Sequence, residues 1–425
     1  MLRQISSQDA GLTALLNRKY ANEAETEGRV REILAAVRDQ GDQAVFEYTR
    51  LFDHVHLSAG NCLVTTAEIE TAYRVVNIEF LAALKEVIGK ITTYHQYQRP
   101  RSWLEPDGMG NIVGQVCRPL ARVGIYVPGG TAAYPSSVLM NAIPARVAGV
   151  PEIIMVTPPG PGGTVNPHTL VAAAEAGVTA IYKIGGAQAI GALAFGTETI
   201  PKVDKITGPG NIYVALAKKL VYGQVGIDMV AGPSEILIVA DETALPAYVA
   251  SDLLSQAEHD VMAAAVLITP SIYLAKQVRE EINSQLTGLH RREIAAQALR
   301  DYGVIIITAD IAEAVALANR FAPEHLELMV ADPFSLLGKI ENAGAIFLGS
   351  KTPEPVGDYY AGPNHILPTG GTSRFASALS VEDFMKKSSV IAYSDEGLKS
   401  ASEAIYCLAM VEGLDAHART IQIRK

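Results

Sequence analysis

The chain has 425 residues, enough for two to four domains with sizeable hydrophobic cores at roughly 100–200 residues per domain. Its 45 acidic and 35 basic side chains give a formal net charge of −10, which excludes a broad basic surface for nucleic acid. Hydrophobic residues make up 49% of the chain and charged residues 19%, so the composition excludes an intrinsically disordered protein.

The first hundred residues are predicted to be mostly helical. Residues 23–40 carry apolar side chains at helical spacing between Val30 and Val37, with charged side chains on the opposite face, and Gly41 is a suitable C-cap. A second long helix is expected over residues 66–97. Nothing in this region suggests chemistry, so we expect it to serve packing.

From about residue 106 to residue 234, β-branched apolar runs alternate with alanine-rich helical patterns. The expected strands are Val123–Val127, Ile153–Val156, Ala180–Ile184 and Val203–Ile206, and the expected helices are Ser136–Ala148, Pro167–Ala176, Ala187–Phe195 and Asn211–Tyr222. Strands that are apolar throughout and alternate with helices are typical of a buried parallel sheet.

A second series of strands and helices begins after Gly232. The expected strands are Glu235–Ala240, Ala264–Thr269, Val304–Thr308, Leu326–Val330 and Ala345–Leu348, and the helices include Pro246–His259, Ile272–Leu286 and Ile311–Phe321. This series predicts a second parallel sheet of similar construction.

The sequence therefore predicts the α/β class, with two Rossmann-like doubly wound parallel-sheet units and small N- and C-terminal helical segments. Residues 1–24 are expected to form the N-terminal helical segment, and residues 381–425 the C-terminal helical tail. We assign residues 25–105 together with 235–380 to one α/β domain, and residues 106–234 to the other.

Three predicted strands of the 106–234 unit end in glycine-rich turns. The turns are Pro128–Gly130, Gly185–Gln188 and Thr207–Asn211. Glycine lets the backbone approach a phosphate, and the helix N-terminus behind each turn favours an anion. No turn has the full G-x-G-x-x-G fingerprint, and a glycine after a strand often serves only a tight turn. Because ligands bind at the carboxyl ends of strands in such sheets, the three turns together suggest a nucleotide site.

Candidate metal ligands are scattered over the second half of the chain. Gln256 and His259 lie at i, i+3 on an expected helix, which would place both on one face. Asp358 and His365 lie in a polar, glycine-containing segment of a kind that usually binds something. Near the C-terminus, Glu412–His417 sets a carboxylate five residues before a histidine. This spacing is not that of a zinc ribbon, and each histidine alone is more often a cap or a surface residue.

Glu324 and His325 form the most suggestive acid/base pair. In an extended chain they would point to opposite faces, whereas in a turn both could face a cleft and act as separate acid/base groups. The competing interpretation is a helix-to-strand connector with a hydrogen-bonded histidine.

The three cysteines, Cys62, Cys117 and Cys407, are far apart, which argues against a disulfide framework and favours a reducing compartment. No histidine or helix N-terminus near Cys117 would lower its pKa, so we interpret it as a small buried hydrophobe and not as a nucleophile. The N-terminus has no apolar signal segment, and the apolar runs are far shorter than the about 20 residues that span a bilayer. We therefore expect a cytoplasmic protein.

Taken in order, these segments resemble histidinol dehydrogenases over about residues 25–420. The motifs that carry the resemblance are Arg122–Gly130, Tyr134–Asn141, Gly185–Ile190, Gly208–Asn211, Ala231–Glu235, Gln256–His259, Pro323–Leu326, Asn364–Thr369 and Glu412–His417. Each motif is short, but their combined order and spacing are highly specific.

The resemblance implies a zinc-dependent, NAD-linked enzyme of histidine biosynthesis. It implies oxidation of L-histidinol to L-histidine through an aldehyde, with two NAD⁺ used in sequence. It also implies a homodimer with sites completed across the interface and one zinc ion per subunit.

Site residues are carried over by motif position. The resemblance implies zinc ligands at Gln256, His259, Asp358 and His417, with His417 from the partner subunit, and an acid/base pair of Glu324 and His325. It implies NAD contacts at Tyr126, Gln188 and Asn211. The implied substrate-binding residues are Ser234, Gln256, His259, His325, Asp358, Glu412 and His417.

Three alternatives remain open on the sequence. The first is a paralogue that oxidises another small alcohol with the same zinc and NAD chemistry. The second is a zinc-dependent hydrolase with a vestigial nucleotide fold, whose activity would not depend on NAD⁺. The third is a non-enzymatic metal-binding protein, which the presence of both Glu324 and His325 makes the weakest of the three.

Overall fold

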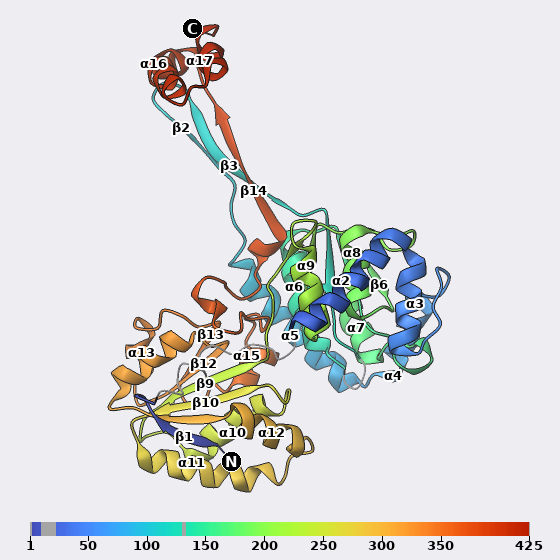
Figure 1. Ribbon diagram of the computed structural model, residues 1–425, viewed down its shortest axis with the longest axis vertical. Helices are drawn as coiled ribbons and strands as arrows, with labels where there is room; N and C mark the ends of the chain where they lie inside the picture. Colours follow the sequence, from blue (N-terminus) through green and yellow to red (C-terminus); the bar gives the residue numbers. More distant parts are fainter. Residues whose placement is uncertain (1, 10–22, 130–132, 425) are drawn as a thin grey trace. The chain divides into compact units, whose positions relative to one another are not determined.

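The computed structural model describes residues 2–9, 23–129 and 133–424, which group into two compact units (Figure 1). The first unit comprises Met1–Gln98 and Ala121–Phe384, and the second comprises Arg99–Leu120 and Met385–Lys425. Within the described residues, no helix combines the length and the apolar character needed to cross a membrane.

The first unit contains a five-stranded parallel sheet in the order β6-β5-β4-β7-β8. Its strands are β4 (Arg122–Tyr126), β5 (Glu152–Val156), β6 (Ala180–Tyr182), β7 (Lys205–Thr207) and β8 (Gly226–Ile227). The helices between them are α6 (Pro135–Ala148), α7 (Pro167–Ala176), α8 (Gly186–Phe195) and α9 (Ile212–Val221). The predicted strand–helix alternation over this part of the chain is confirmed.

Four N-terminal helices belong with the five-stranded sheet. They are α2 (Glu23–Gln40), α3 (Asp42–Asp53), α4 (Thr66–Val75) and α5 (Ile78–Gln96). Val30 and Val37 of α2 are buried in the same core as Tyr126 and Ile184, and α4 and α5 contact α7 and α6. The assignment of residues 25–105 to the domain of the other sheet is therefore wrong, because amphipathic helices do not reveal from sequence which sheet they cover.

The expected long helix over residues 66–97 is two helices. α4 ends at Val75, and α5 begins at Ile78 after a short break. The side chain of Asn77 accepts a hydrogen bond from the backbone N–H of Phe80, so Asn77 is the N-cap that starts the second helix.

The second sheet of the first unit is six-stranded and parallel, in the order β1-β11-β10-β9-β12-β13. Its strands are β1 (Arg3–Ser6), β9 (Glu235–Ala240), β10 (Ala264–Thr269), β11 (Val304–Ile307), β12 (His325–Met329) and β13 (Ala345–Leu348). Its helices are α10 (Pro246–Ala257), α11 (Ile272–Leu286), α12 (Arg292–Tyr302), α13 (Ile311–Phe321), α14 (Phe334–Leu337) and α15 (Glu354–Tyr359). Alternate residues of β9 face opposite ways: Ile236 packs with α10–α12, and Leu237 packs with α13, as expected of a doubly wound sheet.

The N-terminal segment is only partly described. Residues 3–6 form β1, an edge strand that pairs with β11, and not a helix as predicted for residues 1–24. Four residues give too little periodicity to indicate a strand, and the pairing partner lies far along the chain. Residues 10–22 lie outside the described part of the chain.

The second unit is an antiparallel sheet that carries two helices. Its elements are β2 (Trp103–Pro106), β3 (Ile112–Pro119), β14 (Met385–Ala392), α16 (Asp395–Val411) and α17 (Asp415–Gln422). Two predictions are corrected here: residues 106–119 do not belong to the parallel sheet, and residues 381–425 are not only helical. Because β14 contains the polar run Lys386–Ser389, it lacks the apolar alternation by which strands are recognised. Short 3₁₀ turns complete the chain at Pro161–Gly163, Thr372–Arg374 and Val381–Phe384.

Candidate active site and metal centre

Glu324 and His325 are both held by the backbone of one residue, Glu235, on the neighbouring strand. The N–H of Glu235 donates to Oε2 of Glu324 at 2.7 Å, and its carbonyl oxygen lies 3.0 Å from Nδ1 of His325. A carbonyl only accepts hydrogen bonds, so Nδ1 carries a proton, and Nε2 is the nitrogen left to accept one in the neutral ring. Both side chains are buried, with 7% and 3% exposed.

The local chain path explains how two adjacent side chains reach the same partner. Helix α13 ends at Phe321, and its C-cap Ala322 has a φ of 53°, which is left-handed and uncommon for a residue other than glycine. Pro323 then directs the chain into a bend at Glu324, and β12 begins at His325. Of the two geometries considered from the sequence, the turn is the one observed, and it lies at the amino end of β12.

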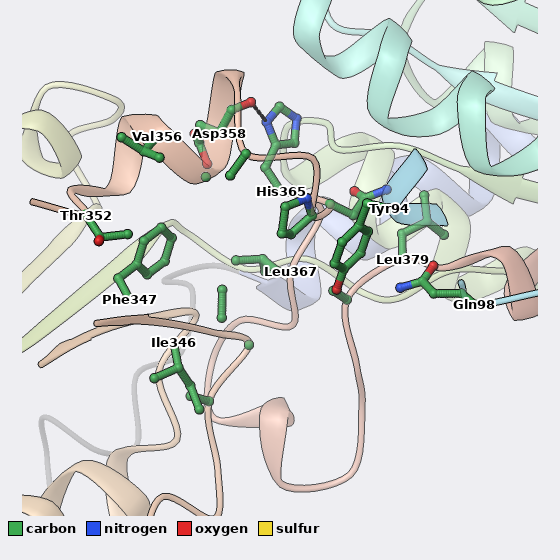
Figure 2. A pocket seen from close by; sticks show the side chains of 18 residues that line it. Tyr94, Gln98, Ile346, Phe347, Thr352, Val356, Asp358, His365, Leu367 and Leu379 are labelled. Carbon is green, nitrogen blue, oxygen red and sulfur yellow. Dashed lines mark hydrogen bonds between the residues drawn. The ribbon is translucent and has the colours of Figure 1, made fainter. Parts of the chain in front are cut away.

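A cavity of about 420 Å³ reaches Asp358, which lies 3.7 Å from His325, although neither Glu324 nor His325 lines it (Figure 2). Its polar lining includes Asp358 and His365, and Phe347 and Leu367 contribute apolar surface. Nδ1 of His365 lies 3.2 Å from the backbone carbonyl oxygen of Asp358, which fixes the ring against α15. A cavity of this size with few polar groups suits a small molecule.

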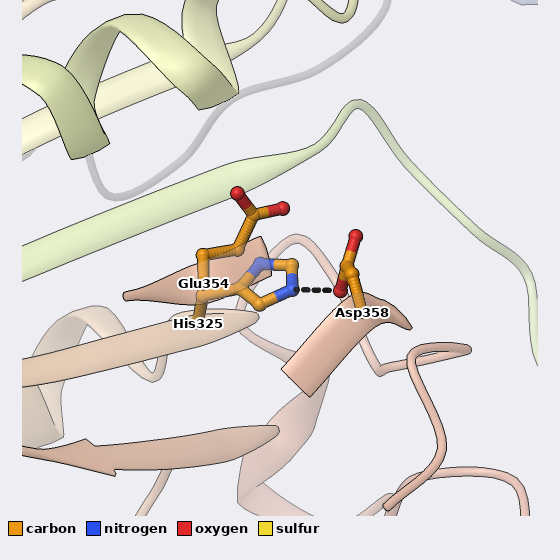
Figure 3. Close-up of side chains that lie close together, drawn as sticks. All are labelled: His325, Glu354 and Asp358. Carbon is orange, nitrogen blue, oxygen red and sulfur yellow. Dashed lines mark ion pairs between the residues drawn. The ribbon is translucent and has the colours of Figure 1, made fainter. Parts of the chain in front are cut away.

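Asp358 and Glu354 lie one turn apart on α15 and meet His325 (Figure 3). Oδ1 of Asp358 is 3.7 Å from Nε2 of His325, and one ligand atom from each of the three side chains lies within 4.8 Å of the others. Asp358 was predicted at the site, whereas Glu354 was not. Its i, i+4 spacing from Asp358 was the only available signal, and that spacing is common on helices.

Burial and neighbouring charges shift the acid/base groups. Burial raises the pKa of Glu324 to about 8. Burial disfavours the imidazolium of His325, yet the charges of Glu324 and Asp358 outweigh it and raise the pKa of His325 to about 10. Burial would also raise the pKa of Asp358, but His325 and His365 hold it below its ordinary value, so this carboxylate stays ionised. Shifts of this kind gather at functional sites.

Gln256 and His259 lie at the carboxyl end of α10. Gln256 is fully buried, and among the described residues neither its amide oxygen nor its amide nitrogen has a hydrogen-bonding partner. His259 lies two residues beyond the helix, where desolvation lowers the pKa of its imidazole and the charge of Asp358 opposes that shift. His259 therefore feels the charge of Asp358, but it is not part of the group of His325, Glu354 and Asp358 described above.

The glycine turns lie at the carboxyl ends of β4, β6 and β7, as the sequence suggests. Gly208 has a φ of 114°, and a side chain there would collide with the backbone of Tyr126. The hydroxyl of Tyr126 accepts a hydrogen bond from the N–H of Gly186 at 3.1 Å, so this buried tyrosine supports a neighbouring turn. Gly130 lies outside the described residues.

Gln188 lies in the first turn of α8, and Asn211 is the N-cap of α9. Asn211 caps α9 by accepting from the N–H groups of Tyr213 and Val214. Gln188 is 1% exposed, and its amide atoms have no hydrogen-bonding partner in the described chain. A buried amide without partners is a candidate ligand contact.

The remaining predicted residues are placed as follows. Ser234 directly precedes Glu235, the anchor of the acid/base pair. Glu412 and His417 are exposed on the helical part of the second unit, whereas Ser234, Gln256, His259, Glu324, His325 and Asp358 belong to the first unit. Cys117 lies on β3 of that unit, with its Sγ 3.6 Å from the carbonyl oxygen of Arg101.

Known proteins share this sequence and fold over almost the whole chain. The sequence model of histidinol dehydrogenase matches residues 16–425. The histidinol dehydrogenase of Heliobacterium mobile is 57% identical over 424 residues, covering 100% of this chain and 99% of that protein. That of Moorella thermoacetica is 59% identical over 397 residues, covering 93% and 94%. The crystal structure of histidinol dehydrogenase from Elizabethkingia anophelis superposes with a TM-score of 0.95 at 37% identity, covering 100% of this chain and 98% of that one. The chain therefore belongs to the histidinol dehydrogenase family of oxidoreductases.

Proposed function

We propose that this protein oxidises L-histidinol to L-histidine through L-histidinal, with zinc bound and two NAD⁺ consumed in sequence. The observation that carries the proposal is the Glu324–His325 pair, anchored on Glu235 and facing Asp358. A four-electron oxidation of an alcohol needs a base for the hydroxyl proton and a second base for water, and this pair offers both.

The residues present fit a zinc ion. The unpartnered amide of Gln256 and the ionised carboxylate of Asp358 offer oxygen, and His259 offers nitrogen. We propose that these three residues hold the metal together with His417 of the partner subunit. When bound, zinc supplies Lewis acidity toward the nitrogen atoms of the substrate.

The five-stranded sheet fits a dinucleotide. Glycine turns and helix N-termini at one sheet edge suit phosphate groups. We propose that Gln188 and Asn211 contact NAD⁺, which accepts the hydride, and that Tyr126 contacts it while supporting the turn at Gly186.

The proton chemistry follows from the two bases. Nε2 of His325 takes the hydroxyl proton as hydride leaves the alcohol carbon, which gives the aldehyde. Glu324 then removes a proton from the water that attacks the aldehyde, and His325 serves again when the hydrated aldehyde loses its second hydride. A cation beside Asp358 would offset that carboxylate and lower the pKa of His325 toward the range that a base needs.

We propose that the metal ligands and two further polar residues recognise the substrate. The ligands Gln256, His259 and Asp358 would lie beside the substrate, and Ser234 and Glu412 would add polar contacts. A carboxylate such as Glu412 suits the N–H of an imidazole ring.

The second unit offers a surface for a homodimer. Its helices expose several apolar side chains, and exposed apolar patches of this kind mark protein interfaces. The exposed residues on and beside these helices are Ile405, Tyr406, Leu408, Met410, Val411, Leu414 and Ile423. Glu412 and His417 lie among them in the sequence, as a site shared between subunits requires.

The test of the proposed function is NADH formation by the purified protein with L-histidinol and NAD⁺. We expect two NADH per histidinol, loss of activity on chelation, and recovery when zinc is added back. If a zinc-loaded protein forms no NADH from histidinol but does so from another small alcohol, the substrate assignment is wrong. Turnover that does not require NAD⁺ would indicate hydrolysis.

Mixing two inactive variants tests the shared site. His259→Ala and His417→Ala each remove one proposed zinc ligand. In a dimer of one chain of each variant, one of the two shared sites keeps both histidines. Random pairing predicts recovery of about a quarter of wild-type activity. Activity is measured after the subunits are mixed and heterodimers are verified by differential tags. If verified heterodimers stay inactive, the four ligands come from one chain.

A further inference from the structure

A buried acidic pair that the proposed chemistry does not use lies next to the site. Glu327 is two residues beyond His325 on β12, so both side chains point to the same face of the strand. Its side chain is 1% exposed, and it interacts with the carboxyl of Asp252 on α10, which is also buried. Burial raises the pKa of Asp252 to about 6 and also raises that of Glu327.

The other contact of Glu327 reaches α15. Its Oε1 accepts a hydrogen bond of 2.9 Å from the backbone N–H of Glu354, the first residue of that short helix. The residue before it is Pro353, which has no polar side chain to satisfy a helix N-terminus. Glu327 therefore acts as the cap of α15 from a neighbouring strand.

A second link joins the same two helices. The hydroxyl of Ser255 on α10 donates to Oε2 of Glu354 at 3.0 Å. Ser255 directly precedes Gln256, and Glu354 lies one turn before Asp358. The network thus connects the three elements that carry proposed site residues. They are α10 with Gln256, β12 with His325 and α15 with Asp358.

We propose that Glu327 is a positioning residue, which with Asp252 fixes α10, β12 and α15 so that Gln256, His325 and Asp358 converge. Glu327 itself touches neither substrate nor metal. The inference rests on the proposed zinc site, because it concerns the geometry of the residues assigned to that site. Groups that orient metal ligands typically change metal affinity or activity 10–100-fold when removed.

Two substitutions of similar size separate positioning from bulk packing. In Glu327→Gln, the amide oxygen can still accept from the backbone N–H of Glu354, and the amide N–H₂ can donate to Asp252. We expect its zinc affinity and kcat to stay within about threefold of wild type. Glu327→Leu fills the space without either contact, and we expect its zinc affinity to fall about 10–100-fold with a comparable loss of kcat.

Zinc affinity is measured by competition with a chromophoric chelator on the full dimer, alongside the thermal midpoint. The matched control is Ile305→Ala, a buried residue on β11 whose loss destabilises the same sheet away from the network. We expect Ile305→Ala to lower the midpoint without weakening zinc binding. The proposal is overturned if Glu327→Leu binds zinc as tightly as Ile305→Ala does. It is also overturned if Glu327→Gln binds zinc as weakly as Glu327→Leu does.

The same measurements separate this proposal from the proposed function. Chelator competition needs no substrate. If the wild-type protein fails to oxidise histidinol while Glu327→Leu still weakens zinc binding relative to Ile305→Ala, the function is wrong and the positioning role stands.

Discussion

His325→Gln is expected to lower both oxidations, from histidinol and from histidinal, by about 10²–10⁴-fold, the usual contribution of a general base. The glutamine amide can still donate to the carbonyl oxygen of Glu235, but it has no nitrogen that accepts a proton. The measurement is NADH formation with each substrate supplied separately. Both halves should fall together, because the same nitrogen accepts a proton in each.

The control for this variant is His168→Gln, which changes a half-buried histidine whose ring packs against Phe80. Its activity should equal that of wild type, and the thermal midpoints of both variants should show that they are folded. If His325→Gln oxidises histidinal at the wild-type rate, His325 is not the base of the second step.

Glu324→Gln is expected to affect the two halves unequally. The glutamine oxygen can still accept from the N–H of Glu235, so the geometry persists while the base for water is lost. We expect oxidation of supplied histidinal to fall about 10²–10⁴-fold, with a smaller loss for histidinol. With a carbonyl-trapping amine present, the variant should release one NADH per histidinol and leave trapped aldehyde.

Glu324→Asp provides the comparison, because it keeps a carboxylate at a different reach. It should retain more of the histidinal step than Glu324→Gln. Equal losses of both halves in Glu324→Gln would contradict the division of roles between Glu324 and His325.

The strands of the two parallel sheets were predictable because they are buried on both faces. The segments Ile236–Ala240 and Ala264–Ile268 are continuous apolar runs, and β9 (Glu235–Ala240) and β10 (Ala264–Thr269) each extend only one residue beyond them. β14 was missed, because Met385–Ala392 is mainly polar and its partner β3 lies in a distant part of the chain. A single sequence does not show pairings of that range.

Some residues of the candidate site were also predictable from the sequence, and others were not. Adjacent acid and imidazole groups drew attention to Glu324 and His325, and the polar segment after β13 drew attention to Asp358. Glu354 was not identified, because its role depends on α15 returning to the amino end of β12. The capping role of Glu327 also requires the fold, since its acceptor contact joins residues on separate elements.

The anchoring of the acid/base pair on Glu235 also bears on how the gene tolerates mutation. Both contacts use the main chain of residue 235, which every amino acid supplies, except that proline lacks the N–H. Most missense changes at this codon therefore leave the two tethers intact and change only the side chain, which accepts from the N–H of Gly370 and whose charge acts on Glu324. In a deep mutational scan, proline at position 235 should stand apart from the other substitutions.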